Sequence, residues 1–222
     1  MIIDAQQIFK AYRDLQVLKG IDFQVEAGEI VSIVGESGAG KSTLLHILGS
    51  LDRPDSGKVL LHGEDIFRVN DKKLAQFRNR HIGFVFQFHN LLPEFTALEN
   101  VCMPAYLGNI SPQKAQKKAL QLMELLGIAE RSHHLPSEMS GGEQQRTAIA
   151  RALVNDPLVV FADEPSGNLD SKNSQELHAL FLKLREELKQ TFVIVTHNIE
   201  LAAMSDRRVV MRDGLIFAEQ HS

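Results

Sequence analysis

An eight-residue segment between two apolar stretches constrains the fold of this chain more than any other feature. Residues 30–34 form a short apolar run, and residues 43–51 carry apolar residues at helical spacing. A chance glycine-rich turn could lie between them, but a strand before the segment and a helix after it are the context of a phosphate-binding loop. The segment matches G-x-x-x-x-G-K-[ST] and consists of Gly35, Glu36, Ser37, Gly38, Ala39, Gly40, Lys41 and Ser42.

The residue types in this loop suit the binding of phosphate. Glycines let main-chain N–H groups turn inward around phosphate oxygens, and the start of the following helix attracts anions. Lys41 is expected to reach the β- and γ-phosphates, and Ser42 is expected to ligate Mg²⁺. With Thr43 added as the next residue, the segment predicts a site for a nucleotide and its Mg²⁺.

The alternation of apolar runs with helical periods predicts an α/β fold with a mostly parallel sheet. Two strands are expected near the start, over residues 2–9 and 17–25, with a polar turn at residues 12–14. Further runs lack alternation, which is typical of strands buried on both faces. These runs are residues 30–34, 82–86, 158–162 and 192–195.

The middle of the chain, residues 88–155, has a mainly helical pattern. Ser111 and Pro112 predict a helix start. Apolar residues then recur at helical spacing until Gly127 ends the pattern. A later helix is expected over residues 174–189. Both apolar stripes are interpreted as core-facing, so the expected layout is a sheet-containing core with a helical insertion.

Polar residues follow three more of the apolar runs: Gln87, then Asp163 and Glu164, then His197. Ligands bind outside the carboxyl ends of parallel strands, so these residues and the loop are expected to meet at one edge. Asp163 is assigned to Mg²⁺, and Glu164 to the attacking water as a general base. Considered singly, each motif also has a structural interpretation. Asp163 and Glu164 could lie in an exposed turn, and Gln87 and His197 could be polar residues whose hydrogen bonds are satisfied within the fold.

Ser140, Gly141, Gly142 and Glu143 have the spacing of a helix capping box. A plain helix start is one interpretation. Two glycines in a first turn, however, cost about 1 kcal/mol each relative to alanine, which favours a close approach of a ligand to the main chain. Because the loop at Gly35 already serves this chain's nucleotide, a second anion site suggests the nucleotide of a partner.

Composition excludes several classes of protein. The chain has 24 Lys and Arg against 28 Asp and Glu. General nucleic-acid binders are usually basic, so no nucleic-acid partner is expected. The single cysteine, Cys102, excludes an internal disulfide and fits a reducing cytoplasm. No signal peptide is expected, and no apolar run approaches the roughly 20 residues of a membrane-spanning helix. A membrane function would therefore need another chain.

These motifs, in this order, resemble the nucleotide-binding subunit of an ABC-type ATPase over essentially the whole chain. The resemblance implies that ATP is the nucleotide and that the chain forms a head-to-tail homodimer on ATP binding. The loop at Lys41 of one copy then faces Ser140 and its neighbours in the other. The resemblance also implies that Tyr12 stacks on adenine, that Gln87 bridges Mg²⁺ and the transporter contact, and that His197 senses the γ-phosphate.

The family pattern also implies a D-loop that includes Asp170. Met139 and Glu143 stand where the family more often has Leu and Gln, and no catalytic position is degenerate. The implied architecture is a single domain. Residues 1–87 and 156–222 form the core with an antiparallel β subdomain, and residues 88–155 form a helical subdomain. That subdomain holds the signature motif of the family, which includes Ser140, Gly141, Gly142 and Glu143.

Two stretches resemble one branch of the family. Residues 164–170 are similar to the E-P-[ST]-G-N-L-D version found in lipoprotein-releasing, macrolide-export and cell-division ATPases, and residues 87–101 are similar to the lipoprotein-releasing members. This implies a motor on the cytoplasmic face of the bacterial inner membrane, held by two integral membrane subunits contacted from Gln87 to Phe95. Exposed or half-exposed apolar residues are then expected, with core packing as the alternative, at Phe88, Leu91, Leu92 and Phe95.

Other functions stay open at this point. A cell-division or macrolide-export ATPase belongs to the same branch. A soluble, non-transport ABC ATPase acting on DNA or ribosomes usually has coiled-coil insertions, tandem domains or a basic surface, which this sequence lacks. An unrelated P-loop kinase or GTPase leaves the signature, 23 residues before Asp163, unexplained.

Overall fold

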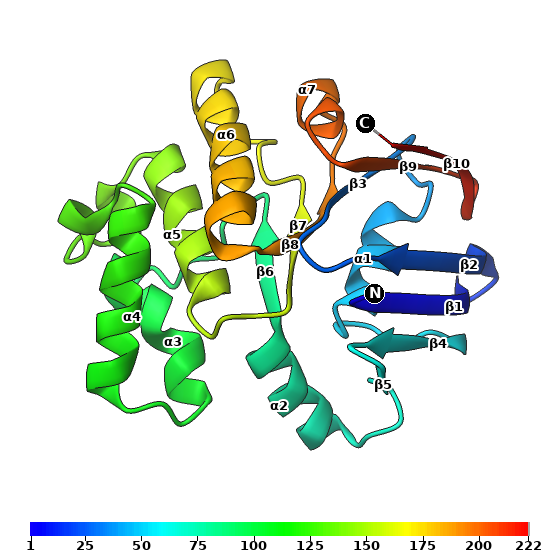
Figure 1. The fold of residues 1–222 in the computed structure, drawn as a ribbon, viewed down its shortest axis with the longest axis horizontal. Coiled ribbons are helices and arrows are strands. Elements are labelled where there is room, and N and C mark those ends of the chain that lie inside the picture. The colour runs from blue at the N-terminus through cyan, green and yellow to red at the C-terminus, as the bar shows by residue number, and fades with distance from the viewer. Residues whose placement is uncertain (222) are drawn as a thin grey trace.

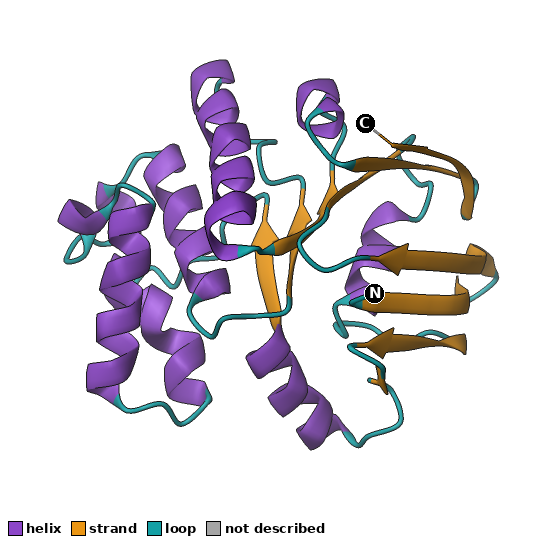
Figure 2. Ribbon diagram, in the orientation of Figure 1, coloured by secondary structure: helices purple, strands orange, loops and turns teal. Residues whose placement is uncertain are grey.

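The computed structural model describes residues 1–221, whose strands form two sheets (Figures 1 and 2). The smaller sheet is antiparallel, with the order β2-β1-β4-β5, and the larger has the order β10-β9-β3-β8-β7-β6. The strands are β1 (Ile3–Tyr12), β2 (Leu15–Val25), β3 (Ile30–Val34), β4 (Ser56–Leu61), β5 (Glu64–Asp65), β6 (Ile82–Phe86), β7 (Val159–Asp163), β8 (Thr191–Val195), β9 (Arg207–Arg212) and β10 (Leu215–His221).

Helices lie on both sides of the larger sheet (Figure 2). The helices are α1 (Lys41–Leu48), α2 (Asp71–His81), α3 (Ala97–Leu107), α4 (Pro112–Leu125), α5 (Gly141–Leu153), α6 (Ser171–Leu188) and α7 (Ile199–Ala203). Helix α1 packs against β2, β7 and β8, whereas α3, α4 and α5 pack on one another at the opposite side (Figure 1). Within residues 1–221, no helix has the length and apolar character needed to cross a membrane.

The parallel strands separate two hydrophobic cores. In β7, Val159 and Phe161 point into a core shared with α1 and the antiparallel sheet. Val160 and Ala162 point the other way, into a core shared with α3 to α6. Both faces are therefore shielded from water, which explains why these strands read as continuous apolar runs.

The predicted α/β class with a mostly parallel central sheet is confirmed. Ser111 is the N-cap of α4, although its side chain makes no capping hydrogen bond, and the predicted stripe on α4 is buried. Helix α6 begins three residues earlier than expected, and Leu188 at its end is exposed, because only the first part of the stripe faces the core. The subdomain boundaries at residues 88 and 155 stay a prediction.

Two regions gave no clear signal in the sequence. Helix α2 buries only Leu74, so its sequence has no apolar stripe. Strand β9 begins with Arg207 and Arg208, and β10 is mostly exposed. A buried arginine in a strand is stable only with partners that are distant in the sequence, and local patterning does not reveal them.

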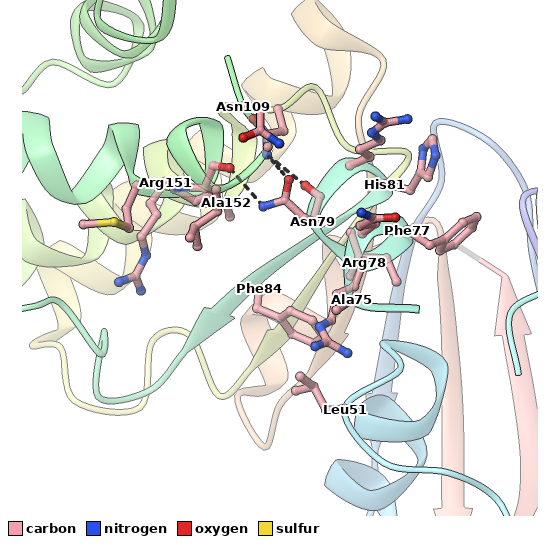
Figure 3. A pocket seen from close by; sticks show the side chains of 18 of the residues that line it. Leu51, Ala75, Phe77, Arg78, Asn79, His81, Phe84, Asn109, Arg151 and Ala152 are labelled. Carbon is pink, nitrogen blue, oxygen red and sulfur yellow. Dashed lines mark hydrogen bonds between the residues drawn. The ribbon is translucent and has the colours of Figure 1, made fainter. Parts of the chain in front are cut away.

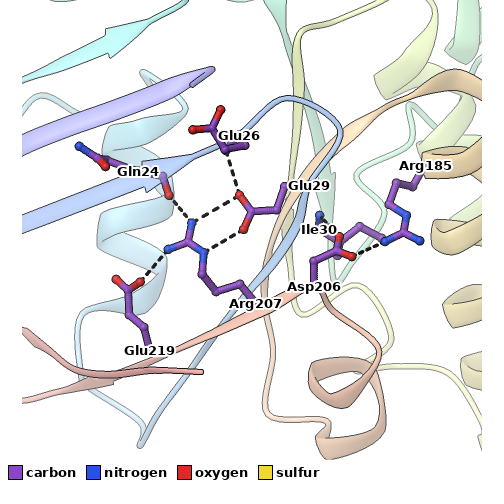
Figure 4. Close-up of polar contacts among 8 residues, drawn as sticks. All are labelled: Gln24, Glu26, Glu29, Ile30, Arg185, Asp206, Arg207 and Glu219. Carbon is purple, nitrogen blue, oxygen red and sulfur yellow. Dashed lines mark hydrogen bonds and ion pairs between the residues drawn. The ribbon is translucent and has the colours of Figure 1, made fainter. Parts of the chain in front are cut away.

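Those partners surround Arg207 at the junction of the two sheets (Figure 4). Its Nε lies 2.8 Å from Oε1 of Glu29, and its Nη1 lies 2.9 Å from Oε2 of Glu219. Its Nη2 donates to the main-chain oxygen of Gln24 in β2. Despite burial, the two carboxylates hold the pKa of Arg207 above its usual range. The network therefore ties the antiparallel sheet to the larger one.

Candidate functional site

The carboxyl ends of four parallel strands lie in register at one edge of the larger sheet. Ile33 of β3 pairs with Val195 of β8, Val195 pairs with Asp163 of β7, and Asp163 pairs with Phe86 of β6. The polar residues that follow these strands are therefore neighbours along one edge, which is where ligands bind in sheets of this kind.

The loop after β3 leads directly into α1. Gly40 is the N-cap of α1 with φ 95°, a left-handed conformation, and no side chain caps the helix. A Cβ at Gly40 would lie 2.9 Å from Cδ2 of Leu18 and 3.0 Å from the main-chain oxygen of Val17, so glycine is required there. Side-chain acceptors cap α2, α3, α5, α6 and α7. The uncapped N–H groups of α1 suit an anion such as phosphate.

Lys41 and Tyr12 border this loop. Nζ of Lys41 donates to the main-chain oxygens of Gly35 at 2.8 Å and Glu36 at 2.9 Å, so its charge lies over the loop. Tyr12 is half exposed, and its hydroxyl donates to Asp52 at 2.5 Å. The Asp52 carboxylate raises the pKa of Tyr12, and a hydrogen bond with Thr43 of α1 partly offsets the rise. An exposed aromatic ring therefore lies beside the first turn of α1.

Ser42 and Asp163 form the part of the site that suits Mg²⁺. Oγ of Ser42 lies 3.1 Å from Oδ1 of Asp163, and Nε2 of His46 lies 3.9 Å from Oδ2. Burial raises the pKa of Asp163, and the Ser42 hydrogen bond opposes the rise. A hydroxyl and a half-buried carboxylate beside a phosphate loop are hard oxygen donors of the kind that Mg²⁺ prefers.

Glu164 and His197 are held together. Nδ1 of His197 lies 2.9 Å from Oε2 of Glu164, and the main-chain N–H of His197 donates to the same oxygen at 3.2 Å. Glu164 has φ 49°, and its own N–H donates to the main-chain oxygen of Val195 at 2.9 Å. Neighbouring strands thus hold a strained residue at the end of β7, a feature that clusters at active sites.

Gln87 contacts a different part of the edge. Its Nε2 donates to Oδ1 of Asn168 at 3.0 Å, and Nδ2 of Asn168 donates to the main-chain oxygen of Gln87 at 3.1 Å. Within residues 1–221 the side chain makes no hydrogen bond to Ser42 or Asp163. The structure therefore brings Gln87 to the same edge but does not join it to the other two predicted metal ligands.

Ser140 caps α5 in the capping box that the sequence predicts. Its Oγ donates to Oε2 of Glu143 at 2.9 Å, and Nε of Arg131 lies 2.7 Å from Oε1 of Glu143. The Ser140 main-chain N–H and the Arg131 guanidinium hold the pKa of Glu143 below its usual range. The charge of Glu143 is thus compensated within the chain.

The two signature glycines have different surroundings. A Cβ at Gly142 would lie 2.7 Å from Oδ1 of Asn173 in α6, so packing between α5 and α6 explains this glycine. A Cβ at Gly141 would meet only Leu169, at 3.8 Å, and Gly141 is exposed. Asp170 is exposed as well and caps α6 through the N–H of Asn173. Of the two glycines, only Gly141 is not explained by packing within the chain, and its lack of a side chain therefore points to a ligand from outside.

The fold and this site define a P-loop ATPase of the α/β class. A family model described as "ABC transporter" matches residues 18–167. The chain belongs to the ABC transporter family, as an ATP-binding subunit that hydrolyses ATP.

Relatives and solved structures agree with this assignment. The chain is 63% identical to the "Lipoprotein-releasing system ATP-binding protein LolD" of Cytophaga hutchinsonii, over 97% of this chain and 98% of that protein. It is 58% identical to the protein of the same name from Porphyromonas gingivalis, over 99% and 100%. The dimeric structure of MJ0796, a bacterial ABC transporter cassette, matches with a TM-score of 0.90 at 38% identity, over 99% of this chain and 98% of that one. The MJ0796 dimer bound to ADP and Pi matches with the same values.

Two residues that hold parts of the site carried no sequence signal of their own. Asp52 holds Tyr12, and Arg131 holds Glu143. Each is a common polar residue in a turn or loop. A pattern marks the residues that meet a ligand, whereas these residues act through a partner and are found only from the geometry.

Proposed function

We propose that this chain is the ATPase subunit of an inner-membrane complex that releases lipoproteins toward the outer membrane. The observation that carries the proposal is its similarity to lipoprotein-releasing ATPases over nearly the whole of both chains. The proposed location is the cytoplasmic face of the bacterial inner membrane, where membrane subunits hold the chain.

The geometry supports definite roles in hydrolysis. The N–H groups at the start of α1 and Lys41 bind the β- and γ-phosphates, and Tyr12 stacks on adenine. Glu164 takes a proton from the attacking water, whose oxygen bonds to the γ-phosphorus. The bond from that phosphorus to the β–γ bridging oxygen breaks, and ADP keeps the electron pair. His197 holds Oε2 of Glu164 and senses the γ-phosphate.

Ser42, Asp163 and Gln87 are the residues that would hold Mg²⁺. The ion supplies positive charge that stabilises the negative charge developing on the phosphates. The Ser42–Asp163 contact of 3.1 Å places two of these oxygen donors together.

A second copy of the chain completes the site in this proposal. Ser140 to Glu143 lie on α5, which packs with α3, α4, α6 and β6, whereas the phosphate loop lies on α1 with β2, β7 and β8. Gly141 is exposed, and no close packing within residues 1–221 requires a glycine there. This supports a partner's nucleotide as the ligand of the signature. Asp170 would lie near the same interface.

A groove beside the end of β6 supports the contact with membrane subunits (Figure 3). Its volume is about 880 Å³, and α2, β6 and α3 contribute to its walls. Leu51, Phe84 and Leu107 give it apolar walls. Phe88 in the adjoining loop is 74% exposed, and Leu92 and Phe95 are exposed as well, so the core-packing alternative does not hold for these three. Leu91 is half-buried.

The positive charge of the groove indicates the chemistry of the segment that binds there. Five basic side chains line the groove, and no carboxylate does: they are Lys72, Lys73, Arg78, Arg80 and Arg151. Arg78 and Arg151 donate to main-chain oxygens, whereas Lys72, Lys73 and Arg80 form no ion pair within residues 1–221. The proposed occupant is a cytoplasmic helix of a membrane subunit that carries both apolar and acidic residues.

Purification from native membranes tests the proposal. The tagged chain is extracted in mild detergent, and the proteins that co-purify are identified. We expect two related multi-span subunits with large periplasmic domains to co-purify, and the complex to release lipoproteins with ATP. Membrane subunits of a single kind would support the macrolide-export or cell-division function instead. Purification without any membrane subunit in every nucleotide state would contradict the proposal.

A paired charge reversal tests the groove. Lys72→Glu with Lys73→Glu is expected to remove the co-purifying subunits while ATP binding is unchanged. Lys114→Glu with Lys117→Glu, on the exposed side of α4, is the matched control and is expected to retain them. Equal recovery from both variants would show that the basic groove is not the contact.

A further inference from the structure

Asn168 and Gln87 are linked by two hydrogen bonds across 81 residues of sequence. One bond holds the side-chain nitrogen of Gln87, and the other holds its main-chain oxygen. The end of β6 is thereby attached to the loop between β7 and α6. Within residues 1–221 the side chain of Asn168 makes no hydrogen bond to the predicted phosphate-binding residues, so this pair is a separate feature of the site.

Gly167 leaves the space that the pair needs. A Cβ at Gly167 would lie 2.8 Å from Nε2 and 3.1 Å from Cδ of Gln87. These atoms form the end of a flexible side chain, so a larger residue at position 167 would displace the Gln87 amide rather than the backbone. Gly167 therefore leaves room for the Gln87 amide, and Asn168 holds the amide in that position by a hydrogen bond.

The pair also fixes which end of the amide stays free. Nε2 of Gln87 is engaged, whereas Oε1 has no hydrogen-bond partner within residues 1–221. Mg²⁺ binds oxygen rather than amide nitrogen. Residues that hydrogen-bond to a metal ligand commonly fix its orientation.

We infer that Asn168 is a positioning residue for Gln87: by holding the amide nitrogen, it leaves the amide oxygen as the end available to Mg²⁺. This inference rests on the proposed function of Gln87 as a metal ligand. The orientation of Gln87 then depends on the loop that leads through Asp170 into α6.

The binding of a non-hydrolysable ATP analogue, measured with Mg²⁺ and with EDTA, tests the inference. Asn168→Ala is expected to reduce the gain in affinity from Mg²⁺ by about tenfold and to leave the affinity in EDTA unchanged. Asn168→Asp keeps an acceptor for Nε2 and is expected to keep most of the gain. Gly167→Ala, which displaces the amide without removing Asn168, is expected to show the same loss as Asn168→Ala.

Further variants separate the inference from the proposed function. If Gln87→Ala keeps the full Mg²⁺ effect, the proposed role of Gln87 fails. If Gln87→Ala loses the effect and Asn168→Ala keeps it, only the inference is overturned. The double variant is expected to match Gln87→Ala, and additive losses would show that Asn168 acts elsewhere. Asn70→Ala, which removes the cap of α2, controls for a loss of stability alone.

Discussion

Both contacts from His197 reach one oxygen of Glu164 and leave the other free. Nδ1 and the main-chain N–H of His197 lie 2.9 Å and 3.2 Å from Oε2, whereas Oε1 has no hydrogen-bond partner within residues 1–221. A carboxylate held by one oxygen can present the other to water in a fixed direction, which is what a general base requires. This geometry agrees with the proposed roles, in which His197 positions the carboxylate and Glu164 acts as the base.

Glu164→Gln is expected to bind ATP normally and to hydrolyse it at least about 100-fold more slowly, because the amide has no basic oxygen. Phosphate release, measured beside ATP binding in the same samples, checks this. Glu130→Gln makes the same chemical change at an exposed residue outside the site and serves as the comparison. Turnover near the wild-type rate in Glu164→Gln would assign the base to another residue.

Arg131→Met is expected to weaken ATP-dependent dimerisation about threefold to tenfold, because Glu143 would then present an uncompensated charge to the partner's γ-phosphate. Adding Glu143→Gln removes that charge and is expected to restore dimerisation. Sedimentation at several protein concentrations measures both effects. If the double variant dimerises no better than Arg131→Met, charge at the signature is not the cause.

Arg207→Met is expected to lower the free energy of unfolding by about 3–5 kcal/mol, because Glu29 and Glu219 would lose the cation between them. Urea denaturation measures the loss. Arg208→Met, on the same strand with a partly exposed side chain, is the control and is expected to stay within about 0.5 kcal/mol of the wild type. Similar losses in both variants would mean that the ion pairs of Arg207 do not contribute specifically to the stability of the chain.

The stability of the chain is expected to fall as the pH drops below about 6.5. Burial lowers the pKa of His178, and Glu200 only partly opposes this. Burial also lowers the pKa of His81 and His89; Arg80 acts in the same direction on His81, and Gln144 partly opposes the shift at His89. The unfolded chain therefore takes up protons first on acidification, which costs at most about 1.4 kcal/mol per pH unit for each proton.

Urea midpoints of the wild type and of His178→Leu, compared between pH 7.5 and pH 5.5, check this prediction. The Nε2 atom of His178 is buried without a hydrogen-bond partner, so leucine leaves no unpaired group behind. The variant is expected to lose less stability than the wild type over this range, and an unchanged pH dependence would rule out His178 as a contributor.

The meeting of the candidate residues at one edge of the sheet could be predicted from the sequence for a physical reason. Gln87, Asp163 and His197 each follow an apolar run, and parallel pairing brings strand ends together. Partners such as Asn168 and Arg131 could not be predicted in this way, because their effect depends on contacts formed only after folding. The same limit explains why β9 was missed, since Arg207 is compatible with burial only through Glu29 and Glu219.

Sedimentation of the free chain tests most directly whether a second copy of the chain completes each site. In a Glu164→Gln background, ATP is expected to produce dimers and ADP to leave monomers. Adding Ser140→Arg is expected to abolish the ATP-dependent dimer while the monomer binds ATP with unchanged affinity. A Ser140→Arg chain that still dimerises with ATP, or one whose monomer has lost ATP binding, would contradict a site shared between two copies.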